Sequence, residues 1–348
     1  MTMTKQPPAE VCRQLLRFRP VLVPRVWGGD RILTEFYPDQ VGKVEPPIGE
    51  SWEVSDVGDD PALHSTFEWQ SESGTESCTL RQLIEAFPAD VMGRAIYDGS
   101  AAPRLPLLYK FLDAREHLSV QVHPSDEIIA KLGIDGAGKT EAWIILDAEP
   151  DAFVIYGFDE GVSAQDYLEL AKSGRGQDGL RRYSVKRGDI VYLPAGTVHA
   201  IGAGILLAEI QQSSDTTYRI YDWDRVGMDG QPRQLHLEES AQVPAPADGP
   251  PCPLPPVPEA GQIGYCERLE GAPFTIGEFR CDGGGTDLPH RDDRFGIVTV
   301  FEGQVLLHKG DSEIALGAGD VAFLPAVART ESISVSGTGW GMFFEPNS

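Results

Sequence analysis

The sequence predicts a mainly β fold built from two small barrels of the jelly-roll type. Short runs rich in Val, Ile, Phe and Tyr alternate with Gly, Pro and Asp, from "FVIYGF" at 153–158 to "GWGMFFEP" at 339–346. The stretch "GDIVYLPAGTVHAI" at 188–201 is repeated imperfectly as "GDVAFLPAVARTES" at 319–332. A proline-rich stretch, "PAPADGPPCPLPPVP" at 244–258, separates the two copies. The repeat predicts a duplicated β unit, and the prolines predict an extended connector.

These features predict three parts of the chain. Residues 1–243 form the first barrel, with a helical insertion near 79–100. Residues 244–258 are the linker, and residues 259–348 form a second, degenerate barrel without metal. Within the insertion, Thr79 and Gln82 have the spacing of a capping box at the start of a helix. A second helix is predicted to begin at Ser163 and to stop at Gly174.

Charge and hydropathy exclude several partners. The formal net charge is −24, which argues against nucleic acid, because binding a phosphate backbone requires basic patches. No apolar run approaches the about 18 residues of a membrane span. The N-terminal "MTMTKQPPAEVCRQ" has no apolar core of a secretion signal. We therefore expect a cytoplasmic, acidic monomer that contacts neither membrane nor nucleic acid.

The first copy of the repeat contains a metal-binding pattern. From Gly188 to His199 it reads Gly-x5-Pro-x-Gly-x2-His, which matches the second motif of the cupin family of small jelly-roll barrels. Pro194 and Gly196 make a turn, after which His199 is expected to project into the barrel. The second copy has Thr330 in the position of the histidine. We therefore expect a metal in the first barrel only.

Other ligands can be found upstream. Gln121 and His123 lie two apart on a predicted strand, so both side chains can face the interior. Glu141 begins another strand-like run. Together with His199, these residues make a plausible shell for one Zn²⁺ per chain, with a position left for water or substrate. The same donors would also accept iron or manganese.

Longer stretches resemble one known family. They include "PRVWGGDRI", "IGESWEVSD", "PLLYKFLDAREHLSVQVHPSDE", "GKTEAWIIL" and "LPAGTVHAIGAGILLAEIQQSSDTTYRIYDWDR". The sequence resembles the type I mannose-6-phosphate isomerases, in their short bacterial form. The resemblance implies a pair of cupin barrels with a helical insertion. It also implies a zinc ion that serves the interconversion of mannose 6-phosphate and fructose 6-phosphate, so a small sugar phosphate is the expected partner.

The resemblance also assigns roles to individual positions. Gln121, His123, Glu141 and His199 match the zinc ligands. The catalytic positions match Lys139, Arg219, Asp215 and, with one residue of offset, Glu209. The substrate phosphate is expected at Ser119, Lys110 and Arg225. Larger members carry a histidine where this chain has Gly138, so a mechanism that uses that histidine cannot operate here.

The implied chemistry is proton transfer between C2 and C1 through a cis-enediol. Zn²⁺ would polarise the substrate oxygens, and Arg219 would stabilise the developing negative charge. Lys139, Asp215 and Glu209 are alternative acids or bases. Two other function classes stay open: another metal-cupin enzyme, such as an iron dioxygenase or a different sugar-phosphate isomerase, and a non-catalytic sugar-binding cupin.

Overall fold

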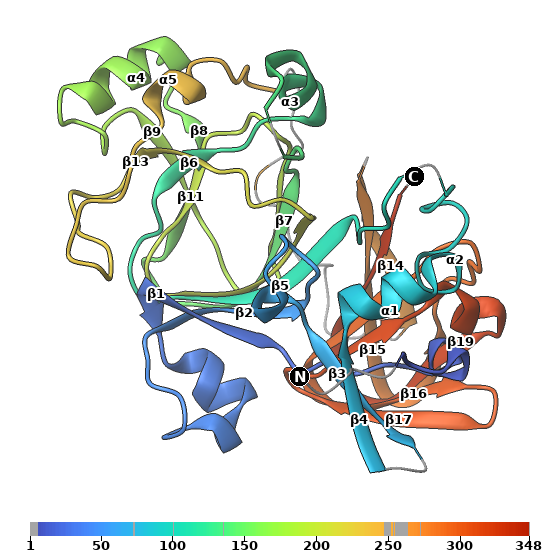
Figure 1. Cartoon of the computed structure of the whole chain (residues 1–348). Helices are drawn as coiled ribbons and strands as arrows, with labels where there is room; N and C mark the ends of the chain where they lie inside the picture. The colour runs from blue at the N-terminus through green and yellow to red at the C-terminus, as the bar shows by residue number, and fades with distance from the viewer. Residues whose placement is uncertain are drawn as a thin grey trace. The chain divides into compact units, whose positions relative to one another are not determined.

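The structure is a computed structural model of the whole chain (Figure 1). It describes residues 6–71, 74–99, 101–134, 136–246, 252, 254, 264–271 and 273–347. The predicted linker, 244–258, lies mostly outside the described residues. The predicted mainly β fold class is confirmed, because strands dominate both halves of the chain.

The chain divides into two compact units. We call Leu22–Ser51 together with Tyr109–Pro258 the first-barrel unit. We call Met1–Val21, Trp52–Leu108 and Glu259–Ser348 the second-barrel unit. The boundaries predicted from the sequence follow the order of the chain, whereas these units interleave: the segment 52–108, with the helical insertion, groups with the C-terminal residues.

Two sheets build the first-barrel unit. One sheet has the strand order β1-β2-β5-β12-β7-β10. Its bounds are β1 Val21–Gly29, β2 Ile48–Val54, β5 Leu107–Ala114, β12 Ile205–Gln212, β7 Glu141–Ala148 and β10 Ile190–Leu193. The other has the order β13-β6-β11-β8-β9. Its bounds are β13 Tyr218–Tyr221, β6 Val120–Val122, β11 His199–Ile201, β8 Phe153–Phe158 and β9 Leu180–Ser184.

Apolar side chains pack inside the barrel of the first-barrel unit, and further apolar side chains pack against its helices. One buried cluster includes Trp143, Val154, Val191 and Leu207. In Figure 1 the helices α3 (Asp126–Leu132), α4 (Ala164–Lys172) and α5 (Leu237–Ser240) gather at one end of the barrel. The predicted helix at Ser163 is confirmed as α4: Ser163 caps it through a capping box with Asp166.

The second-barrel unit is built from long strands. The order is β14-β15-β19-β16-β17, with β18 paired to β16 and a separate hairpin of β3 and β4. The bounds are β14 Gly264–Glu270, β15 Phe274–Asp287, β19 Ile333–Pro346, β16 Gly296–Lys309, β17 Ser312–Gly317, β18 Val321–Leu324, β3 Thr66–Ser71 and β4 Gly74–Thr79. Register shifts interrupt β15 and β16, so each of these two strands can bend around the apolar core.

The insertion contributes helices to this same unit. α1 (Leu80–Ala86) begins at the predicted capping box of Thr79 and Gln82, and α2 (Pro88–Met92) follows it. Beyond α2, the backbone at Gly93 lies so close to the carbonyl of Asp293 that a Cβ would sit 2.1 Å from its oxygen. A glycine is therefore required where the insertion meets the C-terminal part of the chain.

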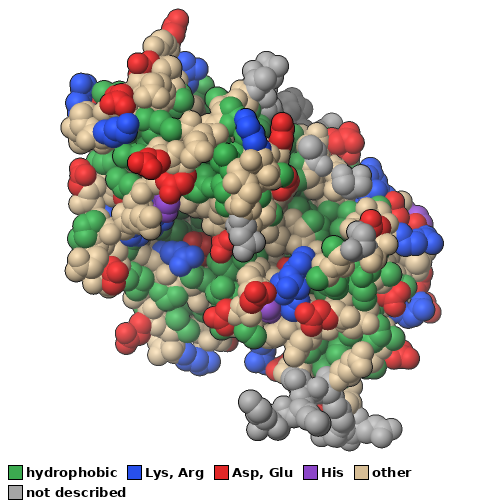
Figure 2. All heavy atoms as spheres, turned by 45° about the horizontal axis from the view of Figure 1, so that its top comes forward, with side chains coloured by type: hydrophobic (Ala, Val, Ile, Leu, Met, Phe, Trp, Pro, Cys, Tyr) green, Lys and Arg blue, Asp and Glu red, His purple; other side chains and the backbone are tan. Residues whose placement is uncertain are grey.

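The surface matches the composition. Figure 2 shows acidic side chains spread over the visible face, with Lys and Arg among them. Of the helices in the described part of the chain, none has the length and hydropathy to cross a membrane.

Candidate metal centre and active site

The register of one sheet brings three predicted residues together. In the first-barrel unit, Gln121 on β6 is paired with His199 on β11 and with Arg219 on β13. Residues paired directly across antiparallel strands point to the same face, so their side chains share one side of the sheet. Ser119 and His123 flank Gln121 at a spacing of two and extend the same polar face.

The other sheet of this unit supplies acidic and basic groups. Glu141 begins β7, where it pairs with Leu193 of β10 and Gln211 of β12. Glu209 on β12 is paired with Trp143, and Lys110 lies on β5, the neighbour of β12. Residues as distant in the sequence as Lys110 and Glu209 thus lie on neighbouring strands of this sheet.

Three of the predicted ligands form a compact buried cluster. His199 Nε2 lies 3.2 Å from Glu141 Oε1, and His123 Nε2 lies 3.5 Å from Glu141 Oε2. The ligand atoms of these three residues all lie within 4.8 Å of one another, and each side chain is buried. Gln121 completes the predicted set, because its Nε2 lies 3.2 Å from His199 Nε2. The amide oxygen and nitrogen of glutamine are interchangeable by a flip, so the oxygen can take this position.

The hydrogen bonds around the cluster fit a cation. The Nδ1 of His123 lies 3.0 Å from the carbonyl oxygen of Thr216, and the Nδ1 of His199 lies 2.8 Å from that of Thr197. A carbonyl can only accept, so each Nδ1 carries a proton, and in both histidines Nε2 is the ring nitrogen directed at Glu141. His123 Nε2 and Glu141 Oε1 are buried without a hydrogen bond to the described residues. Two imidazole nitrogens and a carboxylate that converge in this way are the donor types of a zinc shell.

A chain of alternating charges leads away from the cluster. The ammonium of Lys139 lies 2.8 Å from Glu141 Oε2 and 3.8 Å from Glu209 Oε1. Lys110 Nζ lies 3.0 Å from the same Glu209 oxygen and 3.3 Å from Glu50 Oε2. Arg25 Nε, which is partly exposed, closes the chain 2.7 Å from Glu50 Oε1. The complete order is Arg25, Glu50, Lys110, Glu209, Lys139 and Glu141, and we call it the charge chain.

Burial and neighbours set the acidities. Burial acts to raise the pKa of Glu141, but Lys139 and the two histidines hold that pKa well below its ordinary value. The pKa of Glu209 is raised, first by burial and then by the negative charge of Glu141. Burial and the charge of Lys139 hold the pKa of His123 well below its ordinary value, so its imidazole is neutral. A neutral imidazole is the form that binds metals.

Glu209 is also held by a neutral donor. The indole Nε1 of Trp143 donates to Glu209 Oε2 over 2.9 Å, and the Trp143 ring packs edge-on against the His199 ring at 5.5 Å. One aromatic side chain therefore fixes the position of a candidate base and of a ligand histidine at once.

The remaining predicted residues lie in four different environments. Arg219 donates from Nε to Ser119 Oγ over 3.3 Å. Arg225 forms an ion pair with Asp222, with Nη2 2.9 Å from Oδ1. Asp215 is exposed in the loop before β13. Lys110, expected at the substrate phosphate, lies between the buried carboxylates of Glu50 and Glu209.

Sequence reasoning missed several members of this site. It did not select Arg25, Glu50 or Trp143, although Glu50 and Trp143 fall in the quoted stretches "IGESWEVSD" and "GKTEAWIIL". Glutamate in a strand next to a glycine carries no signal by itself. The indication would have been that a buried strand, β2, contains two acidic residues and therefore needs internal cationic partners.

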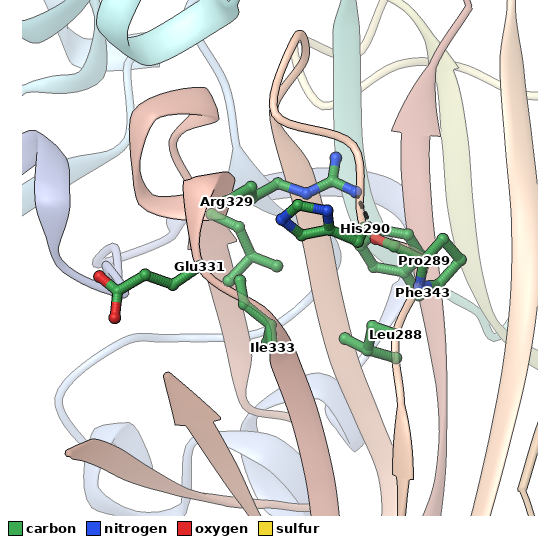
Figure 3. A pocket seen from close by; sticks show the side chains of 8 residues that line it. Leu288, Pro289, His290, Arg329, Glu331, Ile333 and Phe343 are labelled. Carbon is green, nitrogen blue, oxygen red and sulfur yellow. Dashed lines mark hydrogen bonds between the residues drawn. The ribbon is translucent and has the colours of Figure 1, made fainter. Parts of the chain in front are cut away.

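The second barrel has an arginine beside the repeated turn. Thr330 ends a short 3-10 helix, η5 (Ala326–Thr330), and its neighbour Arg329 points inward. Figure 3 shows the Arg329 guanidinium beside the ring of His290, with a hydrogen bond to the carbonyl of Pro289. Arg329 also lies 2.9 Å from Glu345 Oε2 and over the Phe343 ring. The recess that these residues line has no space for a water molecule. That this barrel is metal-free stays a prediction.

Comparisons with known proteins find relatives that share this sequence and fold. Residues 15–141 match the family model described as phosphomannose isomerase type I, catalytic domain. The mannose-6-phosphate isomerase ManA of Bacillus subtilis (strain 168) is 34% identical over 322 residues, which cover 89% of this chain and 92% of that protein. The crystal structure of the mannose 6-phosphate isomerase from Bacillus subtilis superposes with a TM-score of 0.73 and 29% identity, over 95% of this chain and 99% of that one. A zinc-bound structure of mannose 6-phosphate isomerase shares the fold, with a TM-score of 0.70 and 20% identity over 96% of this chain and 100% of the other.

Proposed function

Because this chain belongs to the type I phosphomannose isomerase family, we propose that it interconverts mannose 6-phosphate and fructose 6-phosphate at one zinc ion. The observation that carries this proposal is the convergence of His123, Glu141 and His199 beside Lys139 in one buried cluster. A dioxygenase needs no such cation beside the metal ligands. An aldose–ketose isomerase does, because its reaction develops negative charge on substrate oxygens.

We propose Gln121, His123, Glu141 and His199 as the residues that hold the metal. When bound, Zn²⁺ supplies a Lewis acid that polarises a carbonyl or hydroxyl oxygen of the substrate. The buried position of these side chains would also keep bulk water away from the reacting carbons.

The protein's own groups would move the proton between C2 and C1. The carboxylate of Glu209, whose pKa is raised by burial, is suited to accept a proton from carbon and return it. Lys139 Nζ borders both Glu141 and Glu209 and can supply the proton to a substrate oxygen. Asp215 is the third candidate base, and its exposed position makes it the one that substrate binding would have to bring into contact.

Arg219 and the phosphate site would hold the rest of the substrate. Arg219 donates a hydrogen bond from Nε to the Ser119 hydroxyl. We propose that its guanidinium stabilises the negative charge that develops on the substrate oxygens at C1 and C2. Ser119 and Arg225 are proposed for the phosphate, which fixes C1 and C2 at the metal through remote binding. The cytoplasmic location and the monomeric state belong to the same proposal.

A coupled assay tests the function. Mannose 6-phosphate is supplied, and fructose 6-phosphate is detected with untreated protein, with chelator-treated protein and after Zn²⁺ is restored. We expect activity that chelator removes and zinc restores, because the reaction would depend on the Lewis acid that the proposed ligands hold. Folded protein with a full complement of zinc but without turnover would refute the substrate assignment. Activity that survives complete metal removal would refute the role of the metal.

A further inference from the structure

The segment after β13 gathers arginines around one carboxylate. Asp222, whose side chain is only 6% exposed, receives Arg225 Nη2 at 2.9 Å and Arg233 Nε at 2.7 Å. Arg219 joins them, because its Nη1 donates over 2.9 Å to the carbonyl of Gln234, the residue next to Arg233. A single buried carboxylate thus faces three arginines, and we call Arg219, Arg225 and Arg233 the arginine cluster.

The cluster carries an excess of positive charge. Glu116, 3.8 Å from Arg225, also lies near the cluster and is 53% exposed. Burial and the charge of Arg233 lower the pKa of Arg219. This crowding of like charges stands in a chain of net charge −24. Holding partly buried guanidinium groups together is unfavourable unless an anion is bound among them.

Arg233 has donors to spare. A guanidinium offers five N–H groups, and Arg233 directs Nε and one side of Nη2 at Asp222. No hydrogen bond joins its Nη1 to the described residues. Arg225 uses the same two nitrogens for Asp222, which leaves its own Nη1 toward the more exposed Glu116. Asp222 therefore orients both guanidinium groups and leaves N–H donors of each without a bond to this carboxylate.

A strained turn fixes this arrangement. Trp223 and Asp224 have φ values of 57° and 53°, in the left-handed backbone region that residues other than glycine rarely adopt. The turn closes where Arg225 N donates to Asp222 O over 3.3 Å. Trp223 Nε1 anchors the turn by donating over 2.7 Å to the carbonyl of Leu118, the residue before Ser119. The strained turn is thus anchored to the residue that precedes Ser119, and backbone strain of this kind is characteristic of functional sites.

We propose that Arg233 binds the phosphate group of the substrate and completes, with Arg225 and the Ser119 hydroxyl, a site for a phosphate monoester. Asp222 and Trp223 are positioning residues in this site. The identity of the ligand as a sugar phosphate rests on the proposed function, whereas the anion site itself does not.

Arg233→Gln tests the proposal in the full-length, zinc-loaded chain. Loss of charge-assisted hydrogen bonds to a charged group predicts an increase in KM for mannose 6-phosphate of about 10- to 100-fold, with kcat changed less than about threefold. Turnover of unphosphorylated mannose is expected to stay at the level of the unmodified protein. Arg233→Lys keeps the charge but not the fork, so it should give an intermediate KM. Arg175→Gln removes an arginine that is 63% exposed and paired with Asp178, and serves as the control.

Binding of inorganic phosphate, measured by calorimetry, gives a second readout that needs no turnover. We expect Arg233→Gln to weaken it at least tenfold while the midpoint of thermal unfolding and the zinc content stay close to those of the unmodified protein. Unchanged phosphate affinity and KM in Arg233→Gln would overturn the proposal, even if the protein is an isomerase. If the unmodified protein turns over no mannose 6-phosphate, the proposed function fails, and the phosphate titration still decides the role of Arg233. Should Arg233→Gln not fold, the same comparison is made with Arg233→Lys.

Discussion

Replacing Lys110 with methionine would separate two roles for this residue. The resemblance assigns it to the substrate phosphate, but its ammonium lies 3.0 Å from Glu209 and 3.3 Å from Glu50, and the side chain is 9% exposed. Methionine has a similar length and no charge, so Lys110→Met removes one cation from the interior and leaves two carboxylates behind.

The structure gives the expected cost. Removing one partner of a buried ion pair costs about 3–5 kcal/mol. Each carboxylate keeps one other cation, because Glu209 retains Lys139 at 3.8 Å and Glu50 retains Arg25 at 2.7 Å. We therefore expect the lower end, about 3 kcal/mol of unfolding free energy. Adding Glu50→Gln should restore part of this loss, because the Arg25 side chain is 36% exposed and can be hydrated.

Urea unfolding of zinc-loaded protein measures the first effect, and kinetics with two substrates measures the second. A role in charge balance predicts that kcat/KM for mannose 6-phosphate and for unphosphorylated mannose fall by the same factor, since Glu209 is disturbed in both reactions. A phosphate ligand would instead affect the phosphorylated substrate alone. An unfolding free energy within about 1 kcal/mol of the unmodified protein, combined with a loss confined to mannose 6-phosphate, would refute our reasoning and restore the original assignment.

Two further substitutions test the packing that supports each barrel. Gly28→Ala should cost about 2–3 kcal/mol of unfolding free energy, because the added Cβ would lie 2.4 Å from the backbone nitrogen of Gly49. Gly284→Ala, where a Cβ meets nothing within 4 Å, is the control, and equal unfolding midpoints for the two variants would contradict the prediction. Arg329→Met should cost about 3–5 kcal/mol by leaving Glu345 with one cation fewer in a buried pair, without changing the zinc content. A thermal unfolding curve identical to that of the unmodified protein would show that the pair does not stabilise the second barrel.

Local patterns in the sequence were sufficient for several features. The family resemblance and the mainly β fold class are confirmed. Gly188 and Gly196 have φ values of 86° and 92°, the turn conformations that their motif requires. The helix at Ser163 was visible because capping is decided by neighbouring residues. All of these features depend on contacts within a few positions of the chain.

Features that depend on distant contacts could not be predicted. Glu50 and Arg25 belong to the charge chain only because β1 and β2 join the sheet of β5 and β12, which no local pattern specifies. The repeat aligned Thr330 with His199, but η5 turns the backbone so that Arg329, one position earlier, points inward. The grouping of 52–108 with the C-terminal residues likewise follows from contacts such as that of Gly93 with Asp293.

The charge chain explains why this interior can serve an anionic reaction. Its three cationic and three acidic side chains balance in formal charge before any metal is bound. The protein can therefore fold around these groups without burying an uncompensated charge. Binding a divalent cation at the proposed ligands His123, Glu141 and His199 would then give the site a formal charge of about +2. An interior that is neutral without the metal and positive with it favours a substrate that becomes negative during the reaction. The unfavourable free energy of that positive charge then arises when the metal binds and not when the chain folds.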